Sequence, residues 1–280
     1  MTTTRRALIG GLPLGALALT ASGEAGAQLA QAQDLDQIVA GGTLRVAIPA
    51  LAAPPFFLED DDPAHSVDIA MSRKLAESLD VQLVIDRSAK SFNDAVDLVV
   101  SGQVHLAVCK LSRTLARGRK IVYSRPYAKL THALFINRLR FAQRLGMEDW
   151  QNYVREFDGD LAILAKSSYH GFATEDFPRA KLHEYETWQK VFDSVKAGEV
   201  DAAYGDSYTI SELFRMDAAL SISARSITIN DKIDHLAIGI GPGSRRLEDY
   251  VNLFLDLEQG EQALTVEDLI ARYGVQVGKV

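Results

Sequence analysis

Apolar residues in the first half of the chain recur first at helical and then at strand spacing. Ser91 is followed by apolar residues three or four positions apart up to Val100, and Gly102 comes soon after, which predicts a capped helix over residues 92–100. Residues 104–109 form a continuous apolar run, the pattern of a short strand covered on both faces. Together the two patterns predict a helix that leads into a buried strand of an α/β sheet.

A polar loop follows this strand. In open α/β sheets, ligands bind beyond the carboxyl ends of the strands, so we expect a binding site in this loop. Its cationic side chains suit an anionic ligand. The polar residues are Lys110, Ser112, Arg113, Thr114, Arg117 and Arg119.

The remaining patterns predict further elements of the same kind. Ser66 precedes a helix whose buried face is Val67, Met71, Leu75 and Leu79. An amphipathic stripe of Tyr250, Leu253, Phe254 and Leu257 predicts a helix, and a last helix is expected at 266–273. Short apolar runs predict strands at 44–48, 81–85, 133–136 and 235–240.

The central stretch recurs later in the chain at a constant offset, which predicts two lobes built from one α/β unit. The polar segment 137–140 marks the crossing into the second lobe, and residues 235–240 carry the chain back, so the hinge is two-stranded. The expected lobes are residues 34–135 plus 237–280, and residues 138–234. The repeat aligns Phe92 with Trp188, Val99 with Val195, Gly102 with Gly198, Val104 with Val200, Ala107 with Ala203, and Lys110 with Asp206.

This alignment has a consequence for the binding site. Lys110 follows the strand of the first lobe, and Asp206 follows the equivalent strand of the second. If the lobes face each other, a basic loop and an acidic loop meet across the cleft between them.

Composition narrows the classes of function. The chain has 280 residues, 47% of them hydrophobic, which is enough for a large core, and its net charge of −7 comes from mixed signs that form no basic surface for nucleic acid. Cys109 is the single cysteine, so an internal disulfide is excluded. The chain lacks Gly-x-Ser-x-Gly, His-Glu-x-x-His and any cysteine or histidine cluster with metal-ligand spacing, so we expect no metal and no cofactor.

The amino terminus has the form of an export signal. Arg5 and Arg6 precede a short apolar segment that ends in small residues at 25–27, which predicts a signal peptide over residues 1–27. The paired arginines resemble a twin-arginine signal, and an ordinary secretory signal is the alternative. The apolar segment is too short and interrupted to span a membrane, and no cysteine near residue 27 could carry a lipid. We therefore expect an unlipidated periplasmic protein.

The central stretch resembles the family-three periplasmic solute-binding proteins, the receptors of polar amino-acid importers. The shared pattern is Ser-Gly at 101–102, Leu-Ser-x-Thr-x-x-Arg at 111–117 and Tyr-Ser-x-Pro-Tyr at 123–127, and further matches lie at 42–47, 67–70 and 200–203. The resemblance implies a two-lobed α/β fold of the type II periplasmic-binding-protein class, with a two-stranded hinge. It also implies a monomeric receptor that closes on a small ligand and delivers it to the membrane subunits of an ABC importer.

The resemblance assigns roles to individual residues. Arg117 matches the arginine that binds the ligand carboxylate, and Asp206 matches the aspartate that binds its ammonium group. Ser112 and Ser168 match the hydroxyl contacts from the two lobes, and Phe92 matches an aromatic residue that lies against the ligand side chain. Lys110 and Ser167 complete the expected site. A surface position for Arg117 and a turn-forming role for Asp206 are the alternatives, and Arg113 and Arg119 compete with Arg117.

The sequence departs from the family at three places. Lys166-Ser167-Ser168 replaces Gly-Thr-Thr in the second lobe, and we expect Lys166 to point into solvent. His105 replaces a strand aspartate that Asp201 retains, and we expect this histidine to be packed rather than a ligand. The loop 50–53 lacks the acidic residue with which relatives bind basic side chains, and the expected aromatic is displaced to Phe56 or Phe57, so the ligand's side-chain pocket should be apolar.

Two other classes of function share this fold. Some relatives are cyclohexadienyl dehydratases, and such an enzyme stays as the alternative to a receptor. A sensor on a membrane receptor is less favoured, because the sequence shows no anchoring helix. Binding of amino acids, keto acids and prephenate would distinguish receptor from dehydratase.

Overall fold

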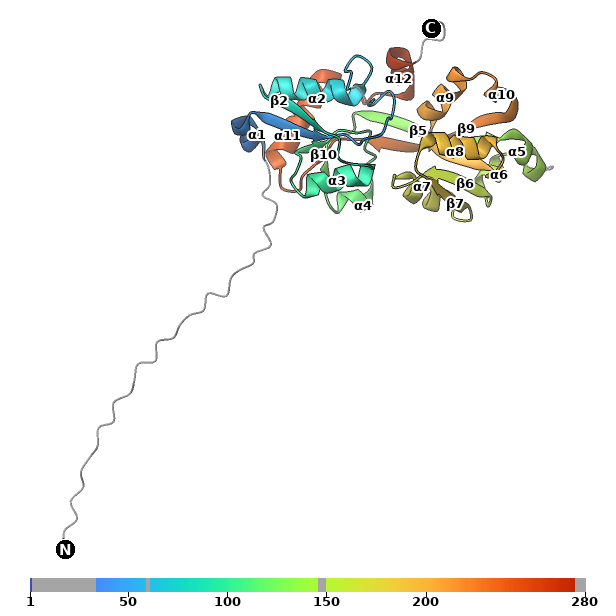
Figure 1. Cartoon of the computed structure of the whole chain (residues 1–280), viewed down its shortest axis with the longest axis horizontal. Helices are drawn as coiled ribbons and strands as arrows, with labels where there is room; N and C mark the ends of the chain where they lie inside the picture. Colours follow the sequence, from blue (N-terminus) through green and yellow to red (C-terminus); the bar gives the residue numbers. More distant parts are fainter. Residues whose placement is uncertain (2–33, 59–60, 146–149, 275–280) are drawn as a thin grey trace.

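The computed structural model describes Met1 and residues 34–58, 61–145 and 150–274. Two five-stranded sheets, each flanked by helices, form two lobes that lie side by side along the long axis of the molecule (Figure 1). The expected α/β fold with two lobes is confirmed. The predicted signal peptide, with Arg5 and Arg6, lies outside the described residues.

The first sheet has the strand order β2-β1-β3-β10-β4. Strand β1 runs parallel to β2 and β3, and β10 runs antiparallel to β3 and β4. Its strands are β1 (Thr43–Ala47), β2 (Gln82–Asp86), β3 (Leu106–Ala107), β4 (Val122–Tyr123) and β10 (Gly239–Ile240). The accompanying helices are α1 (Leu35–Gly41), α2 (Val67–Ser78), α3 (Phe92–Val100), α4 (Leu115–Gly118), α11 (Arg245–Gln259) and α12 (Val266–Tyr273).

The second sheet has the strand order β7-β6-β8-β5-β9. Its strands are β5 (Ala128–Asn137), β6 (Asp160–Leu164), β7 (Lys181–Tyr185), β8 (Ala202–Asp206) and β9 (Ala224–Leu236). The accompanying helices are α5 (Arg138–Leu145), α6 (Trp150–Arg155), α7 (Tyr169–Asp176), α8 (Trp188–Lys196), α9 (Ser207–Met216) and α10 (Leu220–Ser223). None of the helices in the described ranges is long and apolar enough to cross a membrane.

Strands β5 and β9 connect the lobes as an antiparallel pair, from Ala128 opposite Leu236 to Asn137 opposite Ala224 (Figure 1). Alternate residues of β5 point to opposite faces of the second sheet, so Leu134 and Phe135 enter different core clusters. The expected boundary after residue 135 lies inside β5, which belongs by its hydrogen bonds to the second sheet. The division into residues 34–135 plus 237–280 and residues 138–234 stays a prediction.

The internal repeat is visible in the local structure. Helices α3 and α8 each have nine residues, and each begins after a hydroxyl side chain, Ser91 or Thr187, that accepts the backbone N–H three positions on. Gly102 and Gly198 follow these helices with φ of 71° and 72°, a conformation that glycine adopts without steric cost. The two lobes therefore reuse one helix, one turn and one strand.

Three expected elements differ from the structure. The strand predicted at 104–109 keeps only two ladder residues, Leu106–Ala107, and the run 235–240 divides between β9 and β10 because the chain passes there from one sheet to the other. On α11 the predicted buried face differs from the one in the structure. Leu253 and Leu257 are 54% and 78% exposed, and the buried face is instead Leu247, Val251, Phe254 and Leu255.

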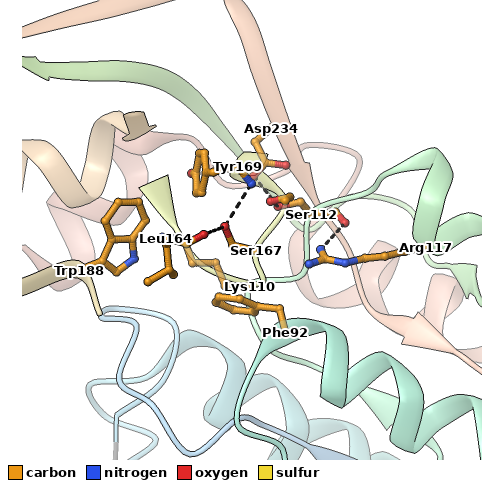
Figure 2. Close-up of a pocket in the computed structure, with 10 residues that line it drawn as sticks. Phe92, Lys110, Ser112, Arg117, Leu164, Ser167, Tyr169, Trp188 and Asp234 are labelled. Carbon is orange, nitrogen blue, oxygen red and sulfur yellow. Dashed lines mark hydrogen bonds between the residues drawn. The ribbon is translucent and has the colours of Figure 1, made fainter. Parts of the chain in front are cut away.

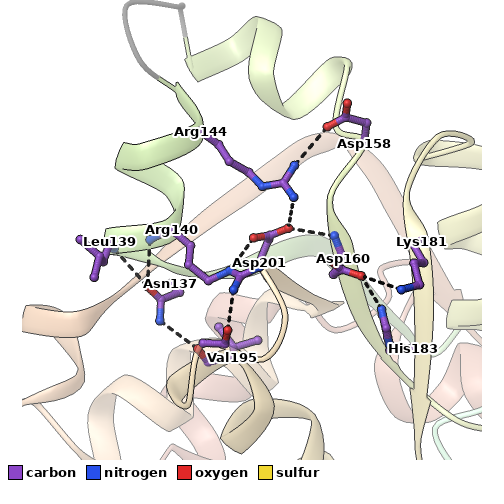
Figure 3. Close-up of polar contacts among 11 residues, drawn as sticks. Asn137, Leu139, Arg140, Arg144, Asp158, Asp160, Lys181, His183, Val195 and Asp201 are labelled. Atoms are coloured by element: carbon purple, nitrogen blue, oxygen red, sulfur yellow. Dashed lines mark hydrogen bonds and ion pairs between the residues drawn. The ribbon is translucent and has the colours of Figure 1, made fainter.

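Asp201 connects helix α5 to the second sheet (Figure 3). Its carboxylate is 2% exposed and accepts hydrogen bonds from Arg140 Nε at 2.6 Å and from the backbone N–H of Asp160 at 2.9 Å. Arg144 adds a second guanidinium at 3.0 Å. Asp201, which immediately precedes β8, is structural, and it lies at the end of the lobe away from the cleft.

Candidate ligand-binding site

A small cavity lies between the lobes (Figure 2). Its volume is about 20 Å³, enough for a water molecule but not for an amino acid. Six of the seven residues expected from the sequence line it: Phe92, Lys110, Ser112, Arg117, Ser167 and Ser168. The seventh, Asp206, joins the site through a contact with Lys110. The structure thus brings the expected residues together, and their roles remain a prediction.

Arg117 lies in the short helix α4, which Thr114 caps by accepting the backbone N–H of Arg117 at 3.3 Å. The arginine is 6% exposed, and its guanidinium donates to Asn93 Oδ1 at 3.1 Å and to the Ser112 carbonyl at 3.2 Å. Burial lowers its pKa. Among the described residues it forms no ion pair with a carboxylate, so this buried cation is available to an anionic ligand. Arg113 and Arg119 are exposed.

Ser112 is a contact point between the two lobes. Its hydroxyl oxygen lies 2.8 Å from Ser168 Oγ of the second lobe, and it donates to Asp234 Oδ2 at 2.7 Å. Asp234, on β9, is 3% exposed, and its other carboxylate oxygen has no hydrogen-bond partner among the described residues. Burial raises the pKa of Asp234, although the hydrogen bond from Ser112 opposes this effect.

Lys110 reaches across the cleft to Asp206. Its Nζ lies 2.7 Å from Asp206 Oδ2, and the two side chains are 7% and 0% exposed. Lys110 Nζ also donates to Thr209 Oγ1 at 3.2 Å and lies 5.3 Å from the centre of the Phe56 ring. Burial alone would raise the pKa of Asp206, but the charge and hydrogen bond of Lys110, together with the hydrogen bonds from Thr209, oppose it, and the net pKa is lowered. The two side chains form a buried salt bridge between the lobes.

The cavity is also lined by four residues that the sequence analysis did not assign to the site. Asp234 lies in a polar segment whose function the sequence did not reveal, and Leu164 and Tyr169 carried no signal. Trp188 aligns with Phe92 in the internal repeat, and this alignment could have identified it. Its ring stacks on Phe192 with centroids 5.4 Å apart.

A larger cavity of about 500 Å³ lies beyond Lys110 and Trp188, which line both spaces. Its walls come from the loop at 52–58 of the first lobe and from α8 and α9 of the second, and they are mostly apolar. This volume lies within the range of small-molecule pockets. The sequence predicts an apolar side-chain pocket, and that this cavity is the pocket stays a prediction. Its apolar residues include Pro54, Pro55, Leu58, Phe192, Leu213 and Met216.

Two departures from the family pattern are resolved by the structure. Lys166 is exposed and does not line the small cavity; its charge helps to lower the pKa of Glu186, after the hydrogen bond and charge of Lys190. Its φ is 53°, a conformation that glycine adopts more readily. His105 is 6% exposed and packed, as expected, and accepts the backbone N–H of Arg45 at 2.9 Å. No group of side chains in the described ranges is arranged to hold a metal ion.

Comparison with known proteins supports a solute-binding role. No protein-family model matches the chain. A curated Escherichia coli protein, the putative ABC transporter arginine-binding protein 2, is 19% identical over 220 residues, which cover 78% of this chain and 85% of that protein.

Solved structures share the fold. One is an amino acid ABC transporter substrate-binding protein of Streptococcus pneumoniae bound to L-arginine, with a TM-score of 0.65 and 19% identity over 86% of this chain and 100% of that one. Another is an ancestral amino acid-binding protein described as a precursor of cyclohexadienyl dehydratase, with a TM-score of 0.65 and 20% identity over 86% of this chain and 99% of that one. The fold is therefore that of the type II periplasmic solute-binding proteins, and the curated relative together with the motifs at 101–127 supports placing the chain in family three of that class.

Proposed function

We propose that this protein is a periplasmic receptor that binds an amino acid or a related small carboxylate and delivers it to the membrane subunits of an ABC importer. The observation that carries the proposal is the buried Arg117 guanidinium, which faces the cavity between the lobes and has no carboxylate partner in the described structure. A buried guanidinium is well matched to a carboxylate, which it can bind through two parallel hydrogen bonds. Ser112 and Ser168 supply hydroxyl groups from opposite lobes.

Ligand entry requires the lobes to separate. The cavity of about 20 Å³ is too small for any amino acid, and Ser112–Ser168 and Lys110–Asp206 contacts bridge the lobes around it. Hinge motion of β5 and β9 would open the cleft and let it close again on the ligand.

A binding screen followed by scattering tests this function. Thermal unfolding is measured with amino acids, 2-oxo acids, 2-hydroxy acids and prephenate, because a ligand of the folded state raises the melting temperature. We expect one class of small carboxylate to do so. Small-angle scattering at saturating ligand should then show the compact closed form and, without ligand, a larger mean radius. An unchanged radius would count against a closing receptor, and no stabilisation by any carboxylate would remove the proposal.

The proposed localisation rests on the amino terminus. We infer that residues 1–27 are removed and that the mature protein is unlipidated and monomeric. If Arg5 and Arg6 direct twin-arginine export, Arg5→Lys with Arg6→Lys should leave precursor in the cytoplasm. A normal periplasmic yield from the double variant would favour an ordinary secretory signal.

A lyase of the cyclohexadienyl dehydratase kind is the second candidate. Asp234 favours it, because a buried carboxyl beside the cavity with a raised pKa can hold a proton for general acid catalysis. Consumption of prephenate by the purified protein, followed by mass spectrometry, separates the two candidates. Loss of prephenate that stops in Asp234→Asn would establish the enzyme, whereas binding without turnover supports the receptor.

A further inference from the structure

Lys110 contacts Asp206, the aspartate to which the family resemblance assigns the ammonium group of an amino-acid ligand. Its backbone is fixed in the first lobe, where its N–H donates to Asp68 Oδ2 at 2.7 Å. Its φ of 49° is unusual for a residue with a side chain. From this position the side chain crosses to the second lobe and places Nζ against Asp206, Thr209 and the Phe56 ring.

Hydrogen bonds from the protein itself already occupy most of the Asp206 carboxylate, and Lys110 takes the position of an ammonium group on Oδ2. Oδ2 accepts from Lys110 Nζ at 2.7 Å, Thr209 Oγ1 at 2.9 Å and Tyr169 OH at 3.3 Å, and Oδ1 accepts from the backbone N–H of Thr209 at 2.8 Å. A carboxylate offers about four lone-pair sites. Oδ1 keeps one lone pair, but the side chain is 0% exposed, so this lone pair does not face solvent. A ligand ammonium group could therefore reach Asp206 Oδ2 only by displacing Lys110.

The charges around the cavity also disfavour an ammonium group. Lys110 and Asp206 neutralise each other, which leaves Arg117 as a cation without an anion in the described site. An α-ammonium group would be a third buried cation beside these two. Among the described residues Asp234 is the carboxyl group that lines the small cavity, and burial raises its pKa. Its unpartnered Oδ1 suits a neutral group instead, since it can accept from a hydroxyl or, when protonated, donate to an oxo group.

Within the receptor function proposed above, on which this inference rests, we propose that the ligand is a small carboxylate without an α-ammonium group, a 2-hydroxy or 2-oxo acid. Its carboxylate binds Arg117, its hydroxyl or oxo group faces Asp234 and Ser112, and Lys110 substitutes for the missing ammonium group at Asp206. The apolar cavity of about 500 Å³ beyond Lys110 and Trp188 leaves room for an apolar side chain.

Matched ligand sets test the proposal on the wild-type protein. Isothermal titration compares lactate and pyruvate with L-alanine, and phenyllactate and phenylpyruvate with L-phenylalanine, together with the corresponding set for the best ligand of the thermal screen. We expect the hydroxy or oxo acid of at least one set to bind about tenfold or more tightly than its amino acid, a difference of about 1.4 kcal/mol. An amino acid that binds as tightly as its hydroxy and oxo counterparts would overturn the inference and leave the receptor function intact. No binding of any carboxylate would remove both.

Two variants at one position give a second, independent measurement. Lys110→Gly frees Asp206, opens space for an ammonium group and suits the positive φ, so it should gain amino-acid affinity about tenfold or more. Lys110→Met keeps the volume and the backbone constraint but removes the charge, so it should not show this gain. Circular dichroism confirms that each variant is folded. If neither variant gains amino-acid affinity while wild type already binds the amino acid and Asp234→Asn abolishes that binding, the ammonium group sits on Asp234 and the inference is wrong.

Discussion

His105 and Asp201 occupy equivalent positions in the two lobes and perform the same structural task with different chemistry. His105 Nδ1 accepts the backbone N–H of Arg45 at 2.9 Å, and Asp201 Oδ2 accepts the backbone N–H of Asp160 at 2.9 Å. Arg45 lies in β1 and Asp160 begins β6, so each side chain attaches its loop to the neighbouring strand. An imidazole can serve as acceptor only while Nδ1 is unprotonated.

The stability of the first lobe should therefore depend on His105 in mildly acidic solution. Burial, and then the charge of Arg45, lower the pKa of His105 to about 4 from an ordinary value of 6.5. Between these values the unfolded chain binds the proton and the folded chain does not, so stability is lost as the pH falls from 6.5 towards 4. The slope of the unfolding free energy is up to about 1.4 kcal/mol per pH unit. His105→Asn keeps an acceptor but cannot titrate, so urea unfolding at several pH values should show a flatter profile; parallel profiles would contradict the assignment.

Asp68 should act in the opposite direction. Burial raises its pKa to about 7 from an ordinary value of 3.8, although the hydrogen bonds with Tyr127 and with the Lys110 backbone oppose the effect. Between pH 3.8 and pH 7 the folded chain holds the proton and the unfolded chain does not. Stability should therefore fall as the pH rises through this window. Asp68→Asn keeps an oxygen for the Lys110 N–H, so the variant should gain stability relative to wild type as the pH rises from 4 to 7. A constant difference between the two proteins across this range would show that Asp68 does not titrate there.

The sequence predicted those parts of the fold that depend on local pattern. Helices α3 and α12 begin and end where spacing and capping residues placed them, and the repeat correctly paired Phe92 with Trp188 as first residues of equivalent helices. The predicted buried face of α11 was wrong because this helix has more hydrophobic residues than one face can bury. Leu253 and Leu257 match the helical period as well as Val251 and Leu255 do, and only the packed sheet selects between them.

The sequence predicted most of the residues that form the candidate site, but not the contacts between their side chains. Sequence position placed Lys110 and Asp206 on facing loops, yet nothing in the sequence shows that the lysine side chain spans the cleft and uses the carboxylate itself. Asp234 was missed for a related reason. It pairs with Leu130, beside a shift in the register of β9 against β5 between Thr131 and His132, and such irregularities leave no clear mark in the sequence.

The hydroxyl of Ser112 should stabilise the protein more than that of Ser168. Ser112→Ala removes the one donor to Asp234 Oδ2 seen in the described structure and leaves both oxygens of a buried carboxyl without a partner. Loss of a partner to a buried polar group costs about 1–3 kcal/mol. Ser168→Ala removes only the serine–serine hydrogen bond, with a net loss of about 0.5–1.5 kcal/mol. Urea unfolding at pH 7 compares the two; equal losses would mean that Asp234 does not depend on Ser112.

Gly205 should be intolerant of a side chain because of Trp188. A Cβ at Gly205 would lie 2.8 Å from Trp188 Cη2, which is closer than van der Waals contact allows, and Trp188 is stacked on Phe192 behind it. Overpacking of this kind costs about 1–3 kcal/mol, and it would displace the indole, which lines the small cavity. Gly205→Ala should therefore lower the melting temperature and weaken ligand binding together. Gly171, where a Cβ meets nothing within 4 Å, provides the control variant Gly171→Ala.

Arg117 should carry the largest share of ligand binding among the cationic side chains of its loop. Arg117→Ala would leave the ligand carboxylate unpaired in a closed cavity, a loss of about 2–5 kcal/mol for a buried charge pair. This corresponds to at least roughly 30-fold in affinity. Arg119→Ala is the matched control, because Arg119 follows α4 on the same loop and is exposed. Isothermal titration with the best ligand of the screen should show the loss in the first variant and almost none in the second. Wild-type affinity in Arg117→Ala would place the carboxylate elsewhere, and the family assignment would then fail at its central residue even if the fold and the hinge stand.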